Sequence, residues 1–261
     1  MPRTVHEYDP AMTEGRLAGL VAVVVGAGQT PGETIGNGRA IATTFAREGA
    51  DVLCVDRIAD RAEETVASIR DAGGNARAFT ADVTADEQCA ATVSHASERW
   101  GSIDVLVNVV GIGGRGDGPA HSADAAAFER IVDVNLTAMW RMCRAALPSM
   151  REQRRGSIVN VSSAASFAGG FQVAYEVSKA GVNRLTTSIA QSNASRGCGA
   201  TRSHSVWSTR RWPWVGSLRP EVFLSSRCAR SATARSRSWA AWERRGMQRT
   251  LRCSSHPTRL G

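Results

Sequence analysis

The chain of 261 residues lacks several features that would restrict its function. None of its six cysteines belongs to a C-x-x-C pair, so neither a zinc site nor a disulfide framework is indicated. No stretch reaches the roughly 18 consecutive apolar residues of a membrane span. The first residues are polar and acidic and lack the apolar stretch of a signal peptide. We therefore expect a cytoplasmic protein with reduced thiols, no bound metal and no membrane partner.

Lysine is almost absent, because Lys179 is the only one among 32 lysine and arginine side chains. The net charge of +8 at first favours a nucleic-acid partner. The excess is confined to residues 198–261, which hold 13 arginines, two acids and five of the seven tryptophans, while residues 1–197 carry −3. We predict an N-terminal arm over 1–16, a core over 17–197 and an anomalous basic tail after it.

The core alternates short apolar runs with amphipathic segments. Apolar runs of this kind are typical of strands buried on both faces of a parallel sheet. The predicted strands cover 20–25, 51–56, 76–80, 103–108 and 156–162. The predicted helices cover 38–48, 57–72, 84–100, 123–150 and 173–194. This order predicts an α/β fold with a Rossmann-like, doubly wound parallel sheet in a single domain.

A glycine-rich turn follows the first predicted strand and opens the first helix. Its glycines are Gly26, Gly28, Gly36 and Gly38. Glycine lets the main chain turn sharply and approach a pyrophosphate, and the helix N-terminus supplies amide donors and a partial positive charge. Ordinary turns also use glycine. The position between a buried strand and a helix is what favours a dinucleotide site.

Asp56 ends the second predicted strand, 18 residues after Gly38. A carboxylate at this point accepts hydrogen bonds from the ribose hydroxyls of an adenosine and repels a 2′-phosphate. This favours NAD over NADP, although a solvated aspartate at a strand end would have the same sequence. Arg57, the next residue, could partly compensate a phosphate.

Tyr175 and Lys179 are four residues apart and therefore share one face of a predicted helix. Free tyrosine, with a pKa of about 10, is a poor base at neutral pH. A cationic lysine one turn away stabilises the phenolate. Arginine cannot reproduce a compact ammonium that bonds both a ribose and a tyrosine. A chance surface Y-x-x-x-K is the alternative, but this one follows the fifth strand of a nucleotide-binding pattern.

Two serines and an asparagine complete the candidate site. Ser162 and Ser163 end the fifth predicted strand, 13 and 12 residues before Tyr175. A hydroxyl there can hold a substrate carbonyl or alcohol oxygen beside the tyrosine. Asn135 either anchors a water in a proton relay to Lys179 or serves as a capping or helix-kinking side chain.

With these motifs, residues from about Leu17 to Arg196 resemble the short-chain dehydrogenase/reductase family. Two further motifs carry the resemblance, Asp82-Val83 after the third strand and Asn108-Val109-Val110-Gly111 after the fourth. The resemblance implies that Asp82 and Val83 flank the adenine, and that Asn108 and Gly111 line the cofactor cleft.

The resemblance also implies a catalytic tetrad of Asn135, a serine, Tyr175 and Lys179. In such a tetrad the tyrosine is the general acid/base and the serine orients the substrate. The lysine binds the nicotinamide ribose and stabilises the phenolate, and the asparagine supports the proton relay. The pattern Ser-Ser-Ala-Ala favours Ser163 as the catalytic serine, whereas a spacing of 13 favours Ser162. We choose Ser163.

The activity implied is that of an NAD(P)-dependent oxidoreductase, with NAD preferred, which interconverts a secondary alcohol and a ketone by hydride transfer. A small-molecule substrate and a homo-oligomer, dimer or tetramer, are implied with it. A second hypothesis is an inactive or unstable cofactor-binding remnant caused by the altered C-terminus. A third is nucleic-acid binding through the arginine- and tryptophan-rich tail.

Two departures from the family pattern stand out. The family turn reads G-x-x-x-G-x-G, but Gly26 and Gly36 are ten apart, so six residues are inserted. Residues 198–261 also lack the family's Arg-hydrophobic-Asn-Ala strand and the Pro-Gly that follows it. Codons allowed for Gly197 to Ser203, read from the third base of the Gly197 codon, can give Val-Arg-Cys-Asn-Ala-Ile. We predict a frameshifted or disordered tail, with the C-terminal strands missing or replaced.

Overall fold

The computed structural model describes residues 15–30, 32 and 34–205 of the chain. The chain divides into two units, Met1–Arg219 and Pro220–Gly261, and the second lies wholly outside the described residues. The N-terminal arm predicted over 1–16 also lies almost entirely outside them. The description below therefore concerns the first unit.

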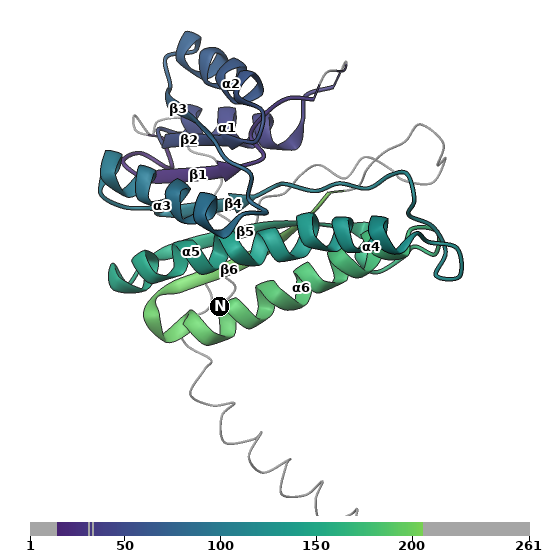
Figure 1. Ribbon diagram of the computed structural model, residues 1–261. Helices are drawn as coiled ribbons and strands as arrows, with labels where there is room; N and C mark the ends of the chain where they lie inside the picture. The colour runs from purple at the N-terminus through teal and green to yellow at the C-terminus, as the bar shows by residue number, and fades with distance from the viewer. Residues whose placement is uncertain (1–14, 31, 33, 206–261) are drawn as a thin grey trace, which may run out of the picture. The chain divides into compact units, whose positions relative to one another are not determined.

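Six parallel strands form one sheet in the order β3-β2-β1-β4-β5-β6 (Figure 1). Their bounds are Val21–Val25 for β1, Asp51–Asp56 for β2, Asn75–Thr80 for β3, Val105–Asn108 for β4, Gly156–Ser163 for β5 and Cys198–Ser205 for β6. The order reverses between β1 and β4, and ligands of doubly wound sheets bind at the carboxyl ends of the strands at that point. The predicted doubly wound parallel sheet is confirmed.

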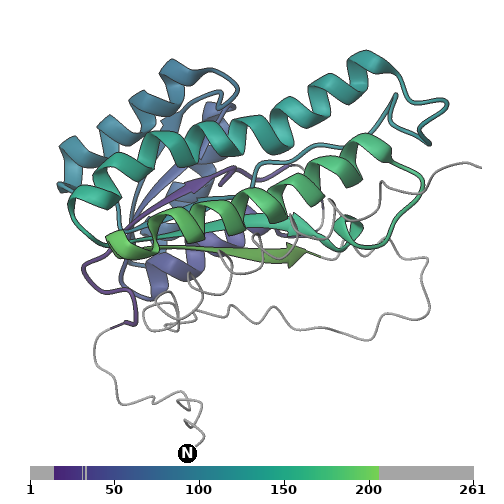
Figure 2. The ribbon, with the colours of Figure 1, turned by 90° about the horizontal axis from the view of Figure 1, so that it is seen from below.

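Helices cover both faces of the sheet. Helices α1 (Asn37–Arg47) and α2 (Ala59–Asp71) pack on one face, and α3 (Asp86–Trp100), α5 (Ala138–Glu152) and α6 (Val173–Asn193) on the other. Figure 2 shows α5 and α6 running side by side along the sheet. Within the described residues, no helix is both long and apolar enough to cross a membrane.

The central strand explains why these residues form a sheet buried on both sides. All five residues of β1 are buried. Val24 packs in the cluster beneath α1 and α2, whereas Val23 and Val25 pack in the cluster beneath α3 and α5. Because neighbouring side chains of a strand point to opposite faces, an uninterrupted apolar run is what a strand between two helical layers requires.

The segment predicted as one helical stretch over 123–150 is helical but not α-helical throughout. Helix α4 (Ala125–Val132) is followed by a π-helical turn, η1 (Asp133–Thr137), and then by α5. The predicted long helical stretch is therefore confirmed, and its turn at residues 133–137 is π-helical rather than α-helical. Single π-helical turns inside α-helices are frequently found at functional sites, and Asn135 lies in the middle of this one.

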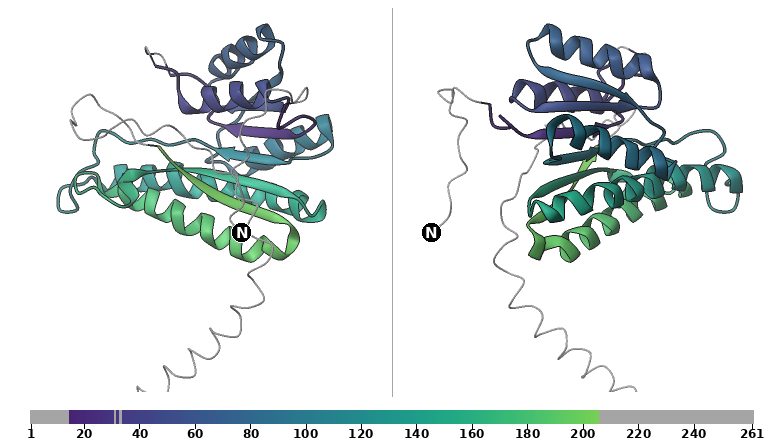
Figure 3. Two further views of the ribbon diagram at one scale, coloured as in Figure 1. Left: turned by 180° about the vertical axis from the view of Figure 1, so that it is seen from behind. Right: turned by 60° about the vertical axis from the view of Figure 1, so that its left-hand side comes forward.

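The first eight residues of the anomalous tail form the edge strand β6 (Figure 3). It pairs with β5 from Gly156↔Cys198 to Ser163↔Ser205. The prediction that the strand–helix alternation ends before residue 198 is therefore wrong for this segment. The strand pairs through main-chain N–H and C=O groups, which any non-proline sequence supplies. Its side chains show no apolar periodicity, so the sequence does not indicate a strand here. Residues 206–261 lie outside the described residues, so the predicted frameshift or disorder there stays a prediction, and nucleic-acid binding stays the rival hypothesis.

Candidate functional site

The glycine turn forms a tight cradle at the carboxyl end of β1. Gly26 has a φ of +84°, a left-handed conformation that favours glycine. A Cβ added at Gly38 would overlap the main-chain carbonyl of Gly26. Helix α1 therefore begins directly against the turn, and only glycine at position 38 permits this approach. The start of α1 is thus held against the turn, and binding of a phosphate by its main-chain amides stays a prediction.

Asp56 lies beside the same turn. Its Oδ2 accepts a hydrogen bond of 3.1 Å from Gly28 N, and its Oδ1 accepts one of 3.0 Å from Ile58 N. A Cβ at Gly28 would overlap the carboxylate. The structure thus brings the carboxylate at the end of β2 and the glycine turn together, as the sequence predicts.

The inserted part of the turn is organised by Gln29, which the sequence reasoning did not single out. Its Oε1 accepts a 2.7 Å hydrogen bond from Gly36 N, and its Nε2 donates to the carbonyl oxygens of Thr30 and Thr34. One side chain therefore ties both ends of the insertion to the start of α1. No local pattern predicts these contacts, which depend on how the loop folds back.

Asp82 and Val83 lie in the segment that follows β3. Thr84 donates its main-chain N–H and its hydroxyl to Asp82 Oδ1, at 3.0 and 2.7 Å, and these bonds lower the pKa of the Asp82 carboxyl. Arg57 is exposed and adds a smaller electrostatic contribution in the same direction. Val83 is buried in the core beneath α3. Contacts of Asp82 and Val83 with an adenine stay predictions.

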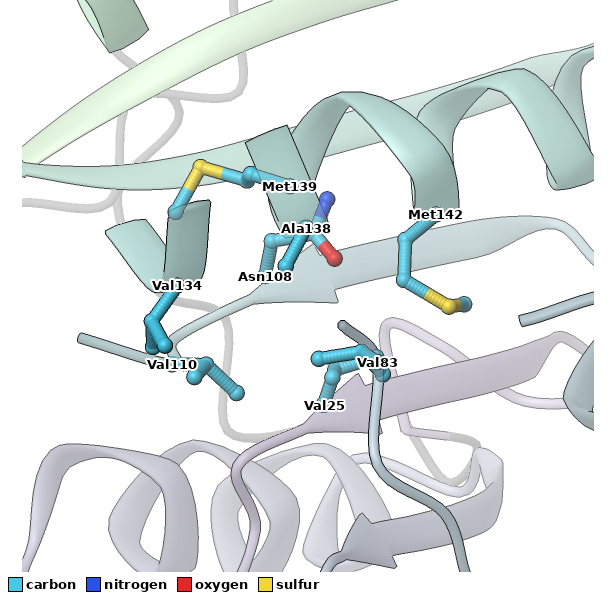
Figure 4. Close-up of a pocket in the computed structure, with 8 residues that line it drawn as sticks. All are labelled: Val25, Val83, Asn108, Val110, Val134, Ala138, Met139 and Met142. Carbon is cyan, nitrogen blue, oxygen red and sulfur yellow. The ribbon is translucent and has the colours of Figure 1, made fainter. Parts of the chain in front are cut away.

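A small apolar hollow lies where β1 and β4 end against η1 and α5 (Figure 4). Its lining residues are Val25, Val83, Asn108, Val110, Val134, Ala138, Met139 and Met142. Asn108 is 2% exposed, and its Nδ2 donates to Asn160 Oδ1 at 2.9 Å. Asn160 in turn donates to Thr186 Oγ1 at 3.0 Å. Asn108 therefore links β4 to β5 and α6, and its contact with a cofactor stays a prediction.

Lys179 is buried at the carboxyl ends of β4 and β5. Its side chain is 3% exposed, and Nζ donates a 2.9 Å hydrogen bond to the carbonyl oxygen of Val161. Burial lowers the pKa of Lys179 to about 8. A Cβ added at Gly111 would lie 3.1 Å from Nζ and 3.6 Å from Asn135 Oδ1. The chain therefore brings Gly111, Asn135 and the single lysine together.

The side chain of Asn135 fastens η1 to the loop after β4. Its Oδ1 accepts from Ile112 N at 2.7 Å, and its Nδ2 donates to Ile112 O at 2.8 Å and to Ser178 Oγ at 3.1 Å. Ser178 Oγ donates to Tyr175 O at 2.7 Å. Asn135 thus lies in the π-helical turn and near Lys179, and its role in a proton relay stays a prediction.

The two serines at the end of β5 lie in different environments. Ser162 is fully buried, and its Oγ donates a 3.1 Å hydrogen bond to the carbonyl oxygen of Lys179. Ser163 is 5% exposed, and its Oγ accepts from Ala165 N at 3.2 Å. A hydroxyl that accepts one bond retains its O–H for donation. The geometry therefore favours Ser163 over Ser162 as a group that can reach a substrate.

Tyr175 lies half-buried in the first turn of α6. Its ring centre is 5.9 Å from Lys179 Nζ, and a Cβ added at Gly113 would lie 3.6 Å from its Cδ2. The predicted face-sharing of tyrosine and lysine is confirmed. Its main-chain N–H donates to Asp117, a residue of the β4–α4 loop that the sequence reasoning passed over.

These features fit a dinucleotide. The glycine turn is a cradle that a Cβ would fill, Asp56 stands beside it at the end of β2, and the space next to Lys179 Nζ is kept open by Gly111. Within the described residues, no group of three or more histidine, cysteine, aspartate or glutamate side chains is close enough to hold a metal ion. Together the fold and this constellation define a nucleotide-binding oxidoreductase class of protein.

Comparisons with known proteins agree with this class. The family described as short chain dehydrogenase matches residues 20–201. The chain is 37% identical over 183 residues to 2-(S)-hydroxypropyl-CoM dehydrogenase 3 of Xanthobacter autotrophicus, covering 70% of this chain and 69% of the relative. It is 37% identical to cis-4-hydroxycyclohexanecarboxylate dehydrogenase of Sinomonas cyclohexanicum, covering 68% of each.

Among solved structures, the chain is similar to a metagenomic short-chain oxidoreductase in complex with NADP. The TM-score is 0.66 and the identity 33%, and the match covers 72% of this chain and 82% of that one. The chain belongs to the short-chain dehydrogenase family. The matched part ends at residue 201, within β6. The family match thus includes part of the strand that the sequence analysis assigned to the anomalous tail.

Proposed function

We propose that this chain is an NAD(P)-dependent oxidoreductase that interconverts a secondary alcohol and a ketone. The observation that carries the proposal is the convergence of Tyr175, Lys179 and Asn135 on the loop at Gly111. A nicotinamide dinucleotide, when bound, supplies or accepts the hydride. Tyr175 is the general acid/base, which donates a proton to the carbonyl oxygen in reduction and accepts it in oxidation.

Lys179 supports this proton transfer in two ways. Its ammonium uses one donor on Val161 O, and the remaining donors are available to a ribose and to the tyrosine side. Its positive charge, 5.9 Å from the Tyr175 ring centre, stabilises negative charge that develops on the tyrosine oxygen during the transfer. Because burial lowers the pKa of Lys179 to about 8, this charge is present at neutral pH and is lost as the pH rises through that value in the cofactor-free protein.

The other two members of the tetrad orient the reacting groups. Ser163 donates its O–H to the substrate oxygen beside Tyr175, while the bond from Ala165 N holds the hydroxyl at the end of β5. Both polar atoms of the Asn135 side chain bond the main chain of Ile112, and its Nδ2 also donates to Ser178 Oγ. These bonds fix the side chain, which supports a role in ordering the proton path near Lys179.

We propose NAD as the preferred cofactor, held by the turn at Gly26, Gly28, Gly36 and Gly38. The support is the Asp56 carboxylate, which would repel a 2′-phosphate, although a structural neighbour is NADP-bound. Asp56→Asn retains hydrogen-bonding atoms and removes the charge. We expect it to bind NADP about tenfold more tightly relative to NAD than the wild type does. A wild-type protein that prefers NADP would contradict the assignment.

We further propose that the protein is a cytoplasmic homo-oligomer, either a dimer or a tetramer. Trp140 on α5 is 41% exposed, beside Arg144 at 4.7 Å from its ring centre, which supports α5 as a contact between subunits. Cys54, Cys89, Cys143 and Cys198 are unpaired and buried, as expected for reducing surroundings. Light scattering of the purified chain tests the oligomer, and a monomeric mass at micromolar concentration would contradict it.

Turnover of an alcohol panel tests the activity itself. The purified chain is incubated with NAD or NADP and with aliphatic and cyclic secondary alcohols, and the reduced nicotinamide and the ketone are both measured. Formation of the two products in equal amounts is expected. Binding of NADH without turnover of any alcohol would instead favour the inactive cofactor-binding remnant, and absence of binding would contradict both.

A further inference from the structure

The first turn of α6 is capped by a carboxylate from another part of the chain. Asp117 lies in the loop between β4 and α4, 58 residues before Tyr175. Its Oδ2 accepts a hydrogen bond from Tyr175 N at 3.0 Å. Its Oδ1 accepts from Ala174 N at 3.0 Å and from Gly118 N at 2.9 Å.

Glu176 of α6 accepts from the main-chain N–H of Gln172 before the helix, but no side chain of α6 accepts from the first helical amides. The first amides of a helix have no partner inside it, and Gln172, at the capping position, makes no side-chain hydrogen bond to the helix. Asp117 takes two of these amides, and Gly118 O accepts a third, from Val173 N at 3.0 Å. A negative charge at this end also interacts favourably with the helix dipole.

The same loop lies beside three members of the proposed tetrad, Asn135, Tyr175 and Lys179. Gly111 lies beside Lys179 Nζ, Ile112 exchanges two hydrogen bonds with Asn135, and Gly113 lies beside the Tyr175 ring. Asp117 is therefore the far end of a strap, residues 111–118, that runs along the site and ends on the tyrosine's own main chain.

Lysine and tyrosine differ in what holds them. Lys179 lies one turn further into α6, is 3% exposed and is bonded to Val161 O. Tyr175 lies in the first turn, where helices fray, and its main-chain N–H depends on Asp117. Loss of the cap would therefore displace the tyrosine while leaving the lysine in place.

We propose that Asp117 is a positioning residue, which fixes the first turn of α6 so that Tyr175 stays aligned with Lys179. The inference rests on the proposed role of Tyr175 as general acid/base. Asp117 does not touch the reacting atoms and acts through the main chain of Tyr175 alone. Displacing a reacting group by about 1 Å can lower a rate about 100-fold, so a cap of this kind affects turnover more than it affects stability.

A matched control exists in the same loop. Asp124 caps α4, and its Oδ1 accepts from Ala126 N at 2.8 Å and from Ala127 N at 3.3 Å. It thus makes the same kind of bonds to the start of a helix, but to one whose first turn carries no tetrad residue. Asp117→Ala and Asp124→Ala are expected to lower stability to a similar extent if capping is all that either residue does.

The test compares Asp117→Ala, Asp117→Asn and Asp124→Ala with the wild type in the full chain. We expect Asp117→Ala to lower kcat at least about tenfold, with the cofactor KM changed less than about twofold. Asp117→Asn retains one acceptor oxygen and should fall between. Asp124→Ala should leave kcat within about twofold of the wild type, although its thermal midpoint should fall by as much as that of Asp117→Ala.

A second measurement does not depend on turnover. The chain has only two tyrosines, Tyr8 and Tyr175, so a protein labelled with ¹³C-tyrosine gives two ring signals, and Tyr175→Phe identifies the relevant one. In Asp117→Ala this signal should move toward the position of an unfolded-chain tyrosine. In Asp124→Ala it should stay where it is in the wild type.

The outcomes separate this inference from the proposed function. An unchanged Tyr175 signal in Asp117→Ala, or an equal fall of kcat in Asp124→Ala, would overturn the positioning role. If every variant and the wild type bind NADH without turnover, the oxidoreductase proposal fails. The tyrosine signal then still decides whether Asp117 positions Tyr175.

Discussion

The cofactor half of the sheet and its catalytic half bury different kinds of side chain. Among the described residues up to position 80, Thr65 is the one buried polar side chain. After β4 begins, the buried side chains include Asn108, Asn135, Asn160, Ser162, Ser163, Ser178, Lys179 and Thr186. The first half is shaped by apolar packing and by glycines that allow close approach of the main chain. The second half is shaped by directed hydrogen bonds among buried polar groups.

This difference predicts how each half responds to substitution. A sheet held by apolar packing fails when atoms are added where none fit. A buried polar network fails when one partner is removed and the other is left unsatisfied. Steric changes should therefore be most harmful beside β1, and changes of single polar atoms should be most informative around β5 and α6.

The largest effect is expected at the glycine turn. Gly38→Ala would place a Cβ on the carbonyl oxygen of Gly26, which is main chain and cannot move aside. We expect the free energy of unfolding to fall by about 3 kcal/mol or more and NADH binding to be lost. Urea denaturation and NADH fluorescence measure the two effects.

The control for this substitution lies in the same turn. A Cβ added at Gly32 meets no atom within 4 Å. Gly32→Ala should therefore change stability by less than about 1 kcal/mol. Equal stability of Gly38→Ala and Gly32→Ala would break the claim that the cofactor half depends on close main-chain approach.

The next effect separates the two serines of β5. Ser163→Ala should lower kcat about 100-fold, because an oriented donor to the substrate oxygen is lost. Ser162→Ala should lower the free energy of unfolding by about 1–2 kcal/mol, because Lys179 O loses the buried donor at 3.1 Å. Its kcat should stay within about threefold of the wild type. Steady-state kinetics and urea denaturation of both variants measure the two effects. A large loss of kcat in Ser162→Ala, with kcat nearly unchanged in Ser163→Ala, would assign catalysis to Ser162 instead.

A smaller effect is expected from Lys179, and it has the sign of a gain in stability. Burial lowers its pKa from 10.5 to about 8 in the folded protein. Below pH 8 Lys179 is charged in both states, and the burial of this charge lowers the free energy of unfolding. Lys179→Met removes this cost. We expect the cofactor-free variant to be about 1–3 kcal/mol more stable than the wild type at pH 7, although inactive.

The pH dependence sharpens the same prediction. Between pH 8 and about 10.5 the unfolded wild type binds more protons than the folded one, so its stability rises with pH. The advantage of Lys179→Met should therefore shrink over this range and be absent above it. Urea denaturation at several pH values measures it. A variant that is less stable than the wild type at pH 7 would show that the hydrogen bond to Val161 O outweighs the cost of burial.

Much of the cofactor half could be predicted from the sequence. The strand predicted over 51–56 is β2 with the same bounds, because an apolar run between polar ends is a local signal. The glycines at positions 26 and 38 predict a tight turn against a helix, and the structure contains their close approach. The pair Tyr175 and Lys179 was equally predictable, since a spacing of four places both on one helix face.

The features that could not be predicted depend on distant partners. The helix break at Asp133–Thr137 is tied to Asn135 and its two bonds to Ile112, which lies 23 residues away. Asp117 is one polar residue in a glycine-rich loop, and its role is visible only when α6 packs against that loop. Strand β6 has no apolar pattern and is formed by main-chain pairing with β5.

The central claim is that this chain binds a nicotinamide cofactor and uses Tyr175 as its acid/base. Tyr175→Phe removes the one hydroxyl and leaves the ring and the main-chain bond to Asp117 in place. NADH affinity and alcohol turnover, measured on the same preparations of wild type and variant, test it most directly. The account predicts NADH affinity within about threefold of the wild type and turnover lowered about 1,000-fold or more. Retained turnover in Tyr175→Phe would contradict it.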